Sequence, residues 1–259
     1  MGNLHYGNNS LFELGQEIKF IHAILRFLIY STGIRKVSVI REAIVVFTRI
    51  PVPGKVKTRL QNCLSSEQCA LIQTSFLKDV LTKCKNTGRD VIVFHTEEED
   101  LSPLISCLSG ESLVPQRGDG LGERMYNAIK YTLRKFNSCL LIGSDIPGMR
   151  SDTMAHAFEI LEKCDLVLGP STDGGYYLVG MKKPLGEVFS LSCYGDENVL
   201  KSTLSCADSA GISYKLLEYC SDVDTESDLL SLAEDITANK IQCPETEKVL
   251  FSLGLLKGK

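Results

Sequence analysis

The sequence predicts an α/β fold in which helices cover both faces of a mostly parallel sheet, giving a three-layer α/β/α sandwich. From Glu42 onward, short apolar segments alternate with longer amphipathic ones, as strands alternate with helices in such folds. The first segment, residues 43–48 (AIVVFT), is continuously apolar and rich in β-branched side chains, which indicates a strand buried on both faces. Ligands of such sheets bind beyond the carboxyl ends of the strands, so a site is expected in the loops that follow the strands.

The other elements follow from the same periodicities. Ser65 and Gln68 form a capping-box pattern at the start of the first long helix, and Gly88 lies just past its end. We expect strands at residues 43–48, 90–95, 112–115, 139–143, 165–169, 176–181 and 213–217. We expect helices at residues 65–86, 100–108, 122–136, 152–163, 196–210, 225–238 and 245–253.

The chain is expected to form one domain over residues 42–259, preceded by a helical extension over residues 1–41. Residues 18–30 (IKFIHAILRFLIY) are apolar, but polar residues recur among them at helical spacing. The segment is also shorter than the roughly 20 residues that a membrane-spanning helix needs. We therefore favour a helix that packs on the domain or on a partner over a helix that lies on a membrane surface.

Charge and cysteine usage narrow the class of protein. The 259-residue chain has a net charge of −4, which argues against a general nucleic-acid-binding protein because such proteins carry a strong basic excess. None of its ten cysteines forms a C-x-x-C pair or lies at zinc-ligand spacing from a histidine. No cleavable signal peptide is evident, and a reducing compartment fits best, so we expect a cytoplasmic protein.

The loop after the first predicted strand, residues 49–60 (RIPVPGKVKTRL), holds four cations and no acidic residue. If this loop is extended, Lys55, Lys57 and Arg59 point to one side. Together with Thr58 and a glycine turn, they would then suit a polyphosphate, which needs cations and free backbone N–H groups. A solvated basic loop is the alternative, but the position at a strand end favours phosphate binding.

A carboxylate lies in the loop after the predicted strand at residues 139–143. Asp145, within residues 143–147 (GSDIP), would sit at the mouth of the ligand crevice. There it can hold Mg²⁺, which takes one or two protein carboxylates together with substrate phosphates. Ser144 is assigned to the nucleotide. The alternative is that Asp145 caps the helix predicted to begin near residue 152.

Two further carboxylates lie farther along the chain. In residues 222–229 (DVDTESDL), Thr225 and Asp228 have the spacing of a helix cap. This leaves Asp222 and Asp224 just outside the helix, where they are available for a second metal contact.

Residues 169–180 (GPSTDGGYYLVG) are the predicted acceptor loop. Two adjacent glycines permit backbone conformations closed to other residues and allow close approach of a ligand. The predicted acceptor-binding residues are Asp173, Gly174, Gly175 and Tyr176. An ordinary hairpin turn is the alternative, since Asp-Gly is a strong turn signal.

Residues 116–125 (QRGDGLGERM) form a polar glycine loop that enters a predicted helix. The loop could bracket a base or a phosphate, and the nucleotide contacts expected from it are Gln116, Gly118, Gly122 and Arg124. A surface position is an equal alternative for Arg124. The glycine spacing here is not that of a Rossmann fingerprint, and the basic loop lacks the spacing of a Walker A motif.

Five motifs in order carry a family resemblance: PxPGxVKTRL (51–60), GERM (122–125), GSDIP (143–147), GPSTDGGYYLVG (169–180) and DVDTESDL (222–229). Over about residues 42–240 the chain resembles the uncharacterised transferase family DUF2064, also called the radical-SAM/selenodomain-associated transferase 1 group. That family is part of the GT-A-like superfamily, with its Rossmann-like sheet, which includes the phospholactate guanylyltransferases and the molybdenum-cofactor nucleotidyltransferases.

The resemblance implies a nucleotide-binding sheet with Lys57 and Arg59 on phosphates and Asp145 on the metal. By similarity to related nucleotidyltransferases, Asp224 would be a second metal ligand. The family tends to carry a Trp-containing stretch after the acceptor loop, where this chain has residues 193–196 (CYGD) and contains no Trp at all. An acceptor contact from that stretch is therefore not carried over.

We expect a transferase that uses Mg²⁺ or Mn²⁺, with a nucleotidyltransferase as the leading hypothesis. An acceptor phosphate or carboxylate would attack the α-phosphorus of a nucleoside triphosphate, with Lys57, Arg59, Asp145 and Asp173 as the catalytic residues. One alternative is a glycosyltransferase with a nucleotide-sugar donor, in which Asp173 lies near the anomeric carbon. Another is a non-catalytic nucleotide-binding protein. The expected partners are the nucleotide and a small-molecule acceptor, without nucleic acid, and an oligomer is compatible with the sequence.

Overall fold

The computed structural model describes residues 40–191, 194–195 and 197–256. The predicted helix within residues 18–30 lies outside the described residues, as do Cys193 and Asp196. Among the described residues, none of the helices combines the length and the apolar character needed to cross a membrane.

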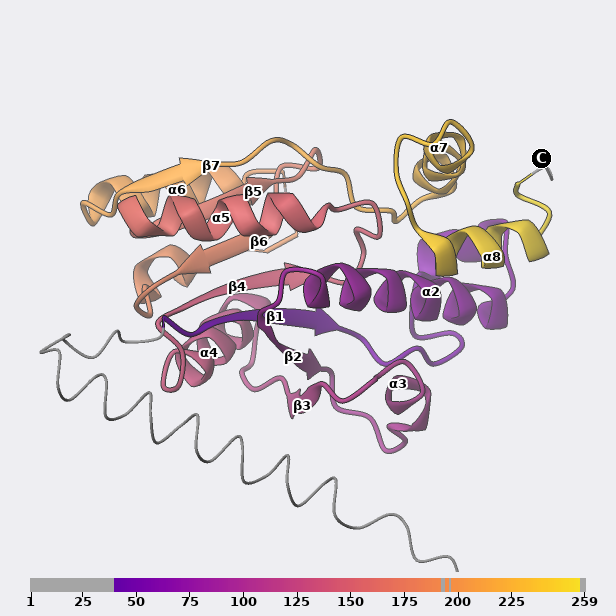
Figure 1. Cartoon of the computed structure of the whole chain (residues 1–259), viewed down its shortest axis with the longest axis horizontal. Coiled ribbons are helices and arrows are strands. Elements are labelled where there is room, and N and C mark those ends of the chain that lie inside the picture. The colour runs from indigo at the N-terminus through magenta and orange to yellow at the C-terminus, as the bar shows by residue number, and fades with distance from the viewer. Residues whose placement is uncertain (1–39, 192–193, 196, 257–259) are drawn as a thin grey trace, which may run out of the picture. The chain divides into compact units, whose positions relative to one another are not determined.

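A seven-stranded sheet forms the middle layer, in the order β3-β2-β1-β4-β6-β5-β7 (Figure 1). Its strands are β1 (Glu42–Thr48), β2 (Asp90–His95), β3 (Ser112–Pro115), β4 (Ser138–Gly143), β5 (Leu166–Pro170), β6 (Tyr176–Met181) and β7 (Tyr214–Leu216). Within the described sheet, β6 alone runs antiparallel, to both β4 and β5. The first residue of β6 therefore lies at the same edge of the sheet as the last residues of its neighbours. The predicted mostly parallel sheet is confirmed.

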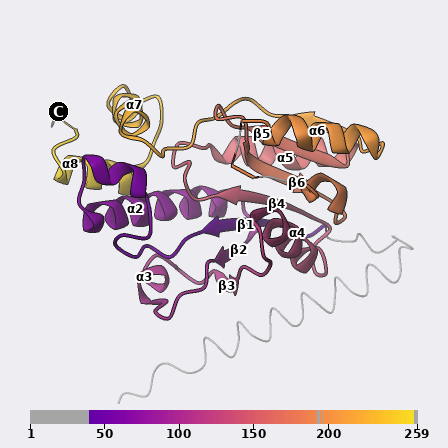
Figure 2. The ribbon, with the colours of Figure 1, turned by 180° about the vertical axis from the view of Figure 1, so that it is seen from behind.

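Helices cover both faces of this sheet because successive side chains of a buried strand point to opposite faces. In β1, Ile44 and Val46 face α2 (Ser66–Lys85) and α5 (Ser151–Lys163), together with the short α3 (Ser102–Ile105). The alternate residues Val45 and Phe47 face α4 (Leu121–Thr132), η2 (Gly186–Phe189) and α6 (Val199–Ser209). Figures 1 and 2, which view the molecule from opposite sides, show these two helix layers. The predicted three-layer α/β/α sandwich is confirmed.

A third apolar cluster lies beyond the sheet. It joins η1 (Thr58–Asn62) and the first half of α2 to α7 (Glu226–Thr237) and α8 (Pro244–Ser252). Buried Asp79 of α2 accepts hydrogen bonds at the start of α8 from Glu245 N (3.1 Å), Thr246 N (2.8 Å) and Thr246 Oγ1 (2.6 Å). The carboxylate thereby satisfies N–H groups that a helix leaves free at its first turn. These bonds fix the start of α8 against α2.

The predicted boundaries differ from the observed ones mainly at the ends of helices, and the helix expected at residues 122–136 ends at Thr132. The helix expected at residues 100–108 is α-helical only over α3, and it continues to Leu108 as turns closed by bonds to the residue three positions back. The helix expected at residues 196–210 begins at Val199. In contrast, β2, β3 and β6 have the predicted bounds, because clear turn residues flank each of these strands.

Candidate functional site

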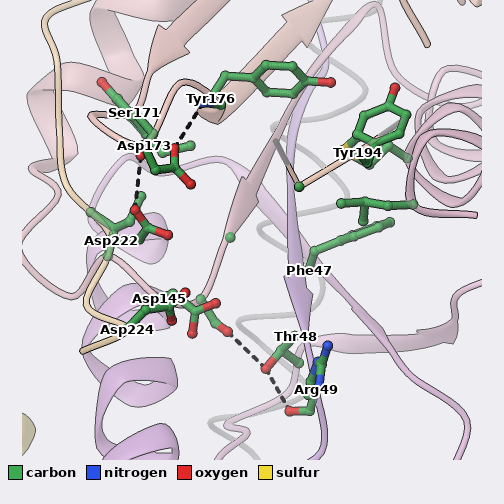
Figure 3. A pocket seen from close by; sticks show the side chains of 18 of the residues that line it. Phe47, Thr48, Arg49, Asp145, Ser171, Asp173, Tyr176, Tyr194, Asp222 and Asp224 are labelled. Atoms are coloured by element: carbon green, nitrogen blue, oxygen red, sulfur yellow. Dashed lines mark hydrogen bonds between the residues drawn. The ribbon is translucent and has the colours of Figure 1, made fainter. Parts of the chain in front are cut away.

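A cavity of about 610 Å³ opens where the strands of the sheet end, as the topology predicts for an α/β sheet. Its walls come from the loops after β1, β4 and β5, the start of β6, the start of α4 and the segment before α7. Figure 3 shows the phenol rings of Tyr176 and Tyr194 on one side of the cavity and the carboxylates of four aspartates on the other. These aspartates, which come from three loops, are Asp145, Asp173, Asp222 and Asp224.

Lys57 is the central contact between two of these loops. Its Nζ donates to Asp224 Oδ1 (2.9 Å) and to the carbonyl oxygen of Val223 (2.7 Å), and it lies 2.7 Å from Asp145 Oδ1. The side chain is only 3% exposed. Burial by itself lowers the pKa of Lys57, but the two carboxylates together outweigh it and the pKa is raised. The ammonium is therefore a fixed positive charge at the floor of the cavity.

The two carboxylates that hold this ammonium remain open to the cavity. The side chains of Asp145 and Asp224 are 43% and 40% exposed. The alternative that Asp145 caps a helix does not hold, because the cap residue of α5 is Arg150 and no side chain caps that helix. Among the described residues, no group of three or more His, Cys, Asp or Glu side chains is arranged to hold a metal ion, so a metal here would rest on this pair and on the ligand.

The basic loop after β1 is not extended. Lys57 has a left-handed backbone conformation (φ 47°, ψ 43°) and is followed by the 3-10 helix η1. This turns the cations in different directions. Arg59 lines the cavity, with Nη1 3.8 Å from Asp224 Oδ2, whereas Lys55 lies outside it and pairs with Glu98 (2.6 Å). The expectation that the three cations point to one side is wrong, because the strand periodicity behind it does not apply.

The floor of the cavity near Asp145 is held by a chain of buried hydrogen bonds. Gln73 of α2 donates to Ser144 Oγ (2.9 Å), and Ser144 donates to Thr48 Oγ1 (3.1 Å). Thr48 in turn donates to the carbonyl oxygen of Arg49 (2.9 Å). Ser144, which was predicted to bind the nucleotide, thus lies in the cavity wall. Its hydroxyl, however, bonds to α2 and β1 and links both to the loop after β4. No motif in the sequence indicated Gln73, because its contact lies 71 residues away along the chain.

A second pair of carboxylates lies beside the hairpin that joins β5 to β6. Asp173 Oδ1 accepts the N–H of Gly175 (2.9 Å), and Asp222 Oδ1 accepts the hydroxyl of Ser171 (3.0 Å). Burial and the nearby charge of Asp173 raise the pKa of Asp222. Asp173 therefore both closes the hairpin turn and lines the cavity, so the two readings of this loop are compatible.

The other predicted residues of the acceptor loop divide between the cavity and its support. Gly175 and Tyr176 line the cavity. Gly174 does not, because its Cα faces the backbone of Glu197, only 2.2 Å from an added Cβ. The hydroxyl of Tyr176 is buried near Tyr194 and Thr203, and burial raises the pKa of this phenol well above its usual value.

The polar glycine loop contributes less to the cavity than predicted. Gln116 lines it, although its amide donates to the carbonyl oxygen of Phe94 (3.1 Å). Gly118 and Arg124 lie outside the lining and bond to each other, with Arg124 Nε donating to Gly118 O (2.8 Å). Gly122 packs against the ring of Tyr194, which would lie 2.4 Å from an added Cβ.

Three lining residues complete the site. Thr58 was predicted and is present. Arg49 and Asp222 line the cavity as well. The sequence signal for Arg49 was its place in the loop after the first strand, and that for Asp222 was its position just before a capped helix.

The fold and the strand-end cavity define a three-layer α/β domain of the class that binds its ligand at the carboxyl ends of the strands. Residues 80–195 match the family model described as "Uncharacterized protein conserved in bacteria (DUF2064)". Three of the five motifs, GERM, GSDIP and GPSTDGGYYLVG, lie within these residues, and the match confirms the predicted resemblance over that part of the chain.

Curated relatives and solved structures agree with this class. Over 131 residues the chain is 28% identical to a 2-phospho-L-lactate guanylyltransferase from Methanocaldococcus vulcanius, a match that covers 50% of this chain and 57% of that protein. The chain thus spans little more than half the length of that relative.

Among solved structures, a protein from Desulfovibrio desulfuricans G20, provisionally assigned as a nucleotide-diphospho-sugar transferase, is 28% identical. Its TM-score is 0.77, and the match covers 83% of this chain and 96% of that one. A nucleotidyl transferase from Methanothermobacter thermautotroptrophicus shares the fold, with a TM-score of 0.54 at 13% identity over 77% of this chain and 99% of that one.

Proposed function

We propose that the domain transfers a nucleotidyl group from a nucleoside triphosphate to a small acceptor that carries a phosphate or a carboxylate. The observation that carries this proposal is the convergence of the basic loop after β1 with Asp145 and Asp224 in one cavity at the strand ends. Phosphates require cations, and a Mg²⁺ or Mn²⁺ ion requires carboxylate oxygens. Similarity to a guanylyltransferase and to a nucleotide-diphospho-sugar transferase supports the nucleotide as the shared ligand.

The residues present fit a divalent cation. Asp145 and Asp224 offer oxygens from two separate loops, and both are partly exposed to the cavity. A cation bound there would offset the charge of the phosphates and of the transition state. Arg49 and Arg59, which line the cavity, would bind the phosphates; Lys55, which pairs with Glu98 outside the lining, is not assigned to them.

In the proposed reaction an acceptor oxygen attacks the α-phosphorus and forms a new O–P bond. The bond between the α-phosphorus and the bridging oxygen breaks, and its electron pair leaves with pyrophosphate. An anionic acceptor has no proton to lose, so the reaction needs no general base. The arginines and Lys57 stabilise the negative charge that accumulates on the leaving phosphates.

A glycosyltransferase is the second candidate because one observation favours it. Asp173 and Asp222 form a carboxylate pair on the side of the cavity away from the basic loop, and hydroxyls of a sugar would donate to their oxygens. Asp173 would then lie near the anomeric carbon of a nucleotide sugar.

Thermal-shift measurements with Mg²⁺ and a panel of nucleoside triphosphates and nucleotide sugars separate the two candidates. We expect at least one triphosphate to raise the melting temperature, and pyrophosphate release to follow when an acceptor is present. Stabilisation by UDP-glucose or GDP-mannose but by no triphosphate would contradict nucleotidyl transfer. Stabilisation without turnover, across a broad acceptor panel, would instead indicate a non-catalytic nucleotide-binding protein.

The metal assignment is tested by Asp145→Ala, which should remove the Mg²⁺-dependent part of the nucleotide shift. Asp152→Ala is the matched control, because Asp152 pairs with Arg150 at the start of α5 and lies outside the cavity. A metal-dependent shift that persists in the Asp145 variant would show that the carboxylate has another role.

A further inference from the structure

The ammonium of Lys57 occupies the space between the two carboxylates that the proposed function assigns to a metal. It has three N–H donors, and three oxygens lie within 2.9 Å of it: one from Asp145, one from Asp224 and the carbonyl oxygen of Val223. The ammonium thus meets a set of oxygens drawn from two loops, which is the arrangement that a hard cation such as Mg²⁺ also seeks.

This position is imposed by the surrounding structure. The left-handed backbone at Lys57 (φ 47°) is uncommon for a residue with a side chain and is maintained only where neighbouring contacts hold it. The ring of Phe76 lies 5.4 Å from the ammonium and covers it from the side of α2. The strain and the burial indicate that the fold directs this lysine to the carboxylate pair.

In the described part of the chain, a single cation makes the close contacts to both carboxylates at this position. Two carboxylates face one ammonium, and Arg59, the next cation of the described cavity lining, stands farther away at 3.8 Å from Asp224. A divalent cation would neutralise the pair completely, and both aspartates are exposed enough to be reached from the cavity.

We propose that Lys57 is an internal cation that occupies the divalent-metal position in the metal-free protein, so that the metal and the lysine exclude each other. The proposal rests on the proposed function only in assigning a metal to Asp145 and Asp224. Binding of the metal displaces the ammonium, and Lys57 becomes available to a phosphate at the same moment. The alternative is a permanent structural contact, in which Lys57 holds the two loops whether or not a metal is bound.

Calorimetric titration with Mn²⁺ in the absence of nucleotide distinguishes a lysine that the metal displaces from a permanent structural contact. Lys57→Met removes the ammonium and keeps an apolar stem of similar length, so the metal no longer has to displace three charge-assisted contacts. We expect Mn²⁺ to bind this variant about 10- to 100-fold more tightly than it binds the wild type. Unchanged or weaker Mn²⁺ binding by the folded variant would overturn the proposal.

Two controls test whether tighter Mn²⁺ binding comes from removing the ammonium from the metal position or only from removing a positive charge nearby. Arg59→Met removes a cation near the same pair without a close contact to it, and it should tighten Mn²⁺ binding far less. Asp145→Asn in the Lys57→Met background should abolish the gain. An equal gain in Arg59→Met, or a gain that survives Asp145→Asn, would contradict the assignment.

Folding provides a second readout. If Lys57→Met unfolds in chelator, circular dichroism should show that Mn²⁺ restores the native spectrum, because the metal replaces the lost cation. Failure of Mn²⁺ to restore it would support the permanent contact instead. These Mn²⁺ experiments use no nucleotide, so their failure would not contradict the proposed nucleotidyl transfer. Failure of the thermal-shift panel with nucleotides would likewise not contradict the competition between Lys57 and the metal.

Discussion

Gly174 and Gly175 stand side by side in the hairpin between β5 and β6, yet the structure constrains them differently. Gly174 has φ +91°, and an added Cβ would lie 2.2 Å from the backbone oxygen of Glu197. Gly175 has an ordinary φ, and its nearest contact is the Asp173 carboxylate at 3.2 Å. The sequence presents the two as one flexible pair, because the backbone that crowds Gly174 comes from more than 20 residues along the chain.

Gly174→Ala should therefore lower the free energy of unfolding by about 2 kcal/mol or more, from left-handed strain plus a clash with backbone that cannot rotate away. Gly175→Ala should cost less than about 1 kcal/mol. Urea unfolding of both variants checks this, and equal losses would show that the loop rearranges freely around either residue.

At the scale of a single element, a capping box begins α7, and the sequence predicted its residues. The Thr225 side chain accepts the N–H of Asp228, and the Asp228 carboxylate accepts from Thr225 N (2.7 Å) and Asp224 N (3.1 Å). Burial by itself raises the pKa of Asp228, but the hydrogen bonds from the Thr225 hydroxyl (2.8 Å) and from these two backbone N–H groups outweigh it, and the pKa is lowered. The cap thereby orients Asp224, which lines the cavity.

Asp228→Asn should lower the free energy of unfolding by about 1 kcal/mol at neutral pH, since it weakens a helix cap. A carboxylate with a depressed pKa in the folded state stabilises above its unfolded pKa of about 4, and this contribution is lost as the pH falls through the folded pKa. The difference in the free energy of unfolding between the variant and the wild type, measured by urea unfolding, should therefore become smaller in acid. Glu226→Gln, which removes a charge from the same turn, is the control and should show no such narrowing.

At the scale of the whole molecule, the cavity is assembled from segments that lie far apart in the sequence. The loops after β1, β4 and β5 and the segment before α7 meet because the strands that carry them end at one edge of the sheet. Helix α8 contributes none of the residues that line the cavity, although its apolar cluster also contains Leu60 and Val223 of these loops. A ligand in the cavity should thus couple the loops to one another without involving α8.

Hydrogen exchange with and without Mg²⁺ and the best-binding nucleotide tests this coupling. We expect slower exchange together in peptides that cover residues 55–60, 143–147 and 222–226, because bound states protect the segments they contact. Exchange in α8 should stay the same. Protection confined to a single loop would mean that the ligand does not bridge them.

Much of the fold could be predicted because its signals are local. The continuous apolar run of β1, the Ser65–Gln68 cap and the turn residues around β2 and β6 each act within a few positions of the chain. The strand-end rule placed Asp145 and Asp173 at one edge, and the cap at Thr225 left Asp224 just outside its helix; the structure brings all three into one cavity.

By itself the sequence determined the three-layer fold and the loops that would carry a site, since periodicity, capping and turn chemistry are encoded residue by residue. Tertiary structure decided the antiparallel course of β6, the exclusion of Lys55 and the role of Gln73. It also decided that Lys57 turns onto Asp145 and Asp224 instead of extending beside Arg59. These depend on contacts between segments tens to more than a hundred residues apart, and such contacts exist only once the sheet has brought the strand ends together.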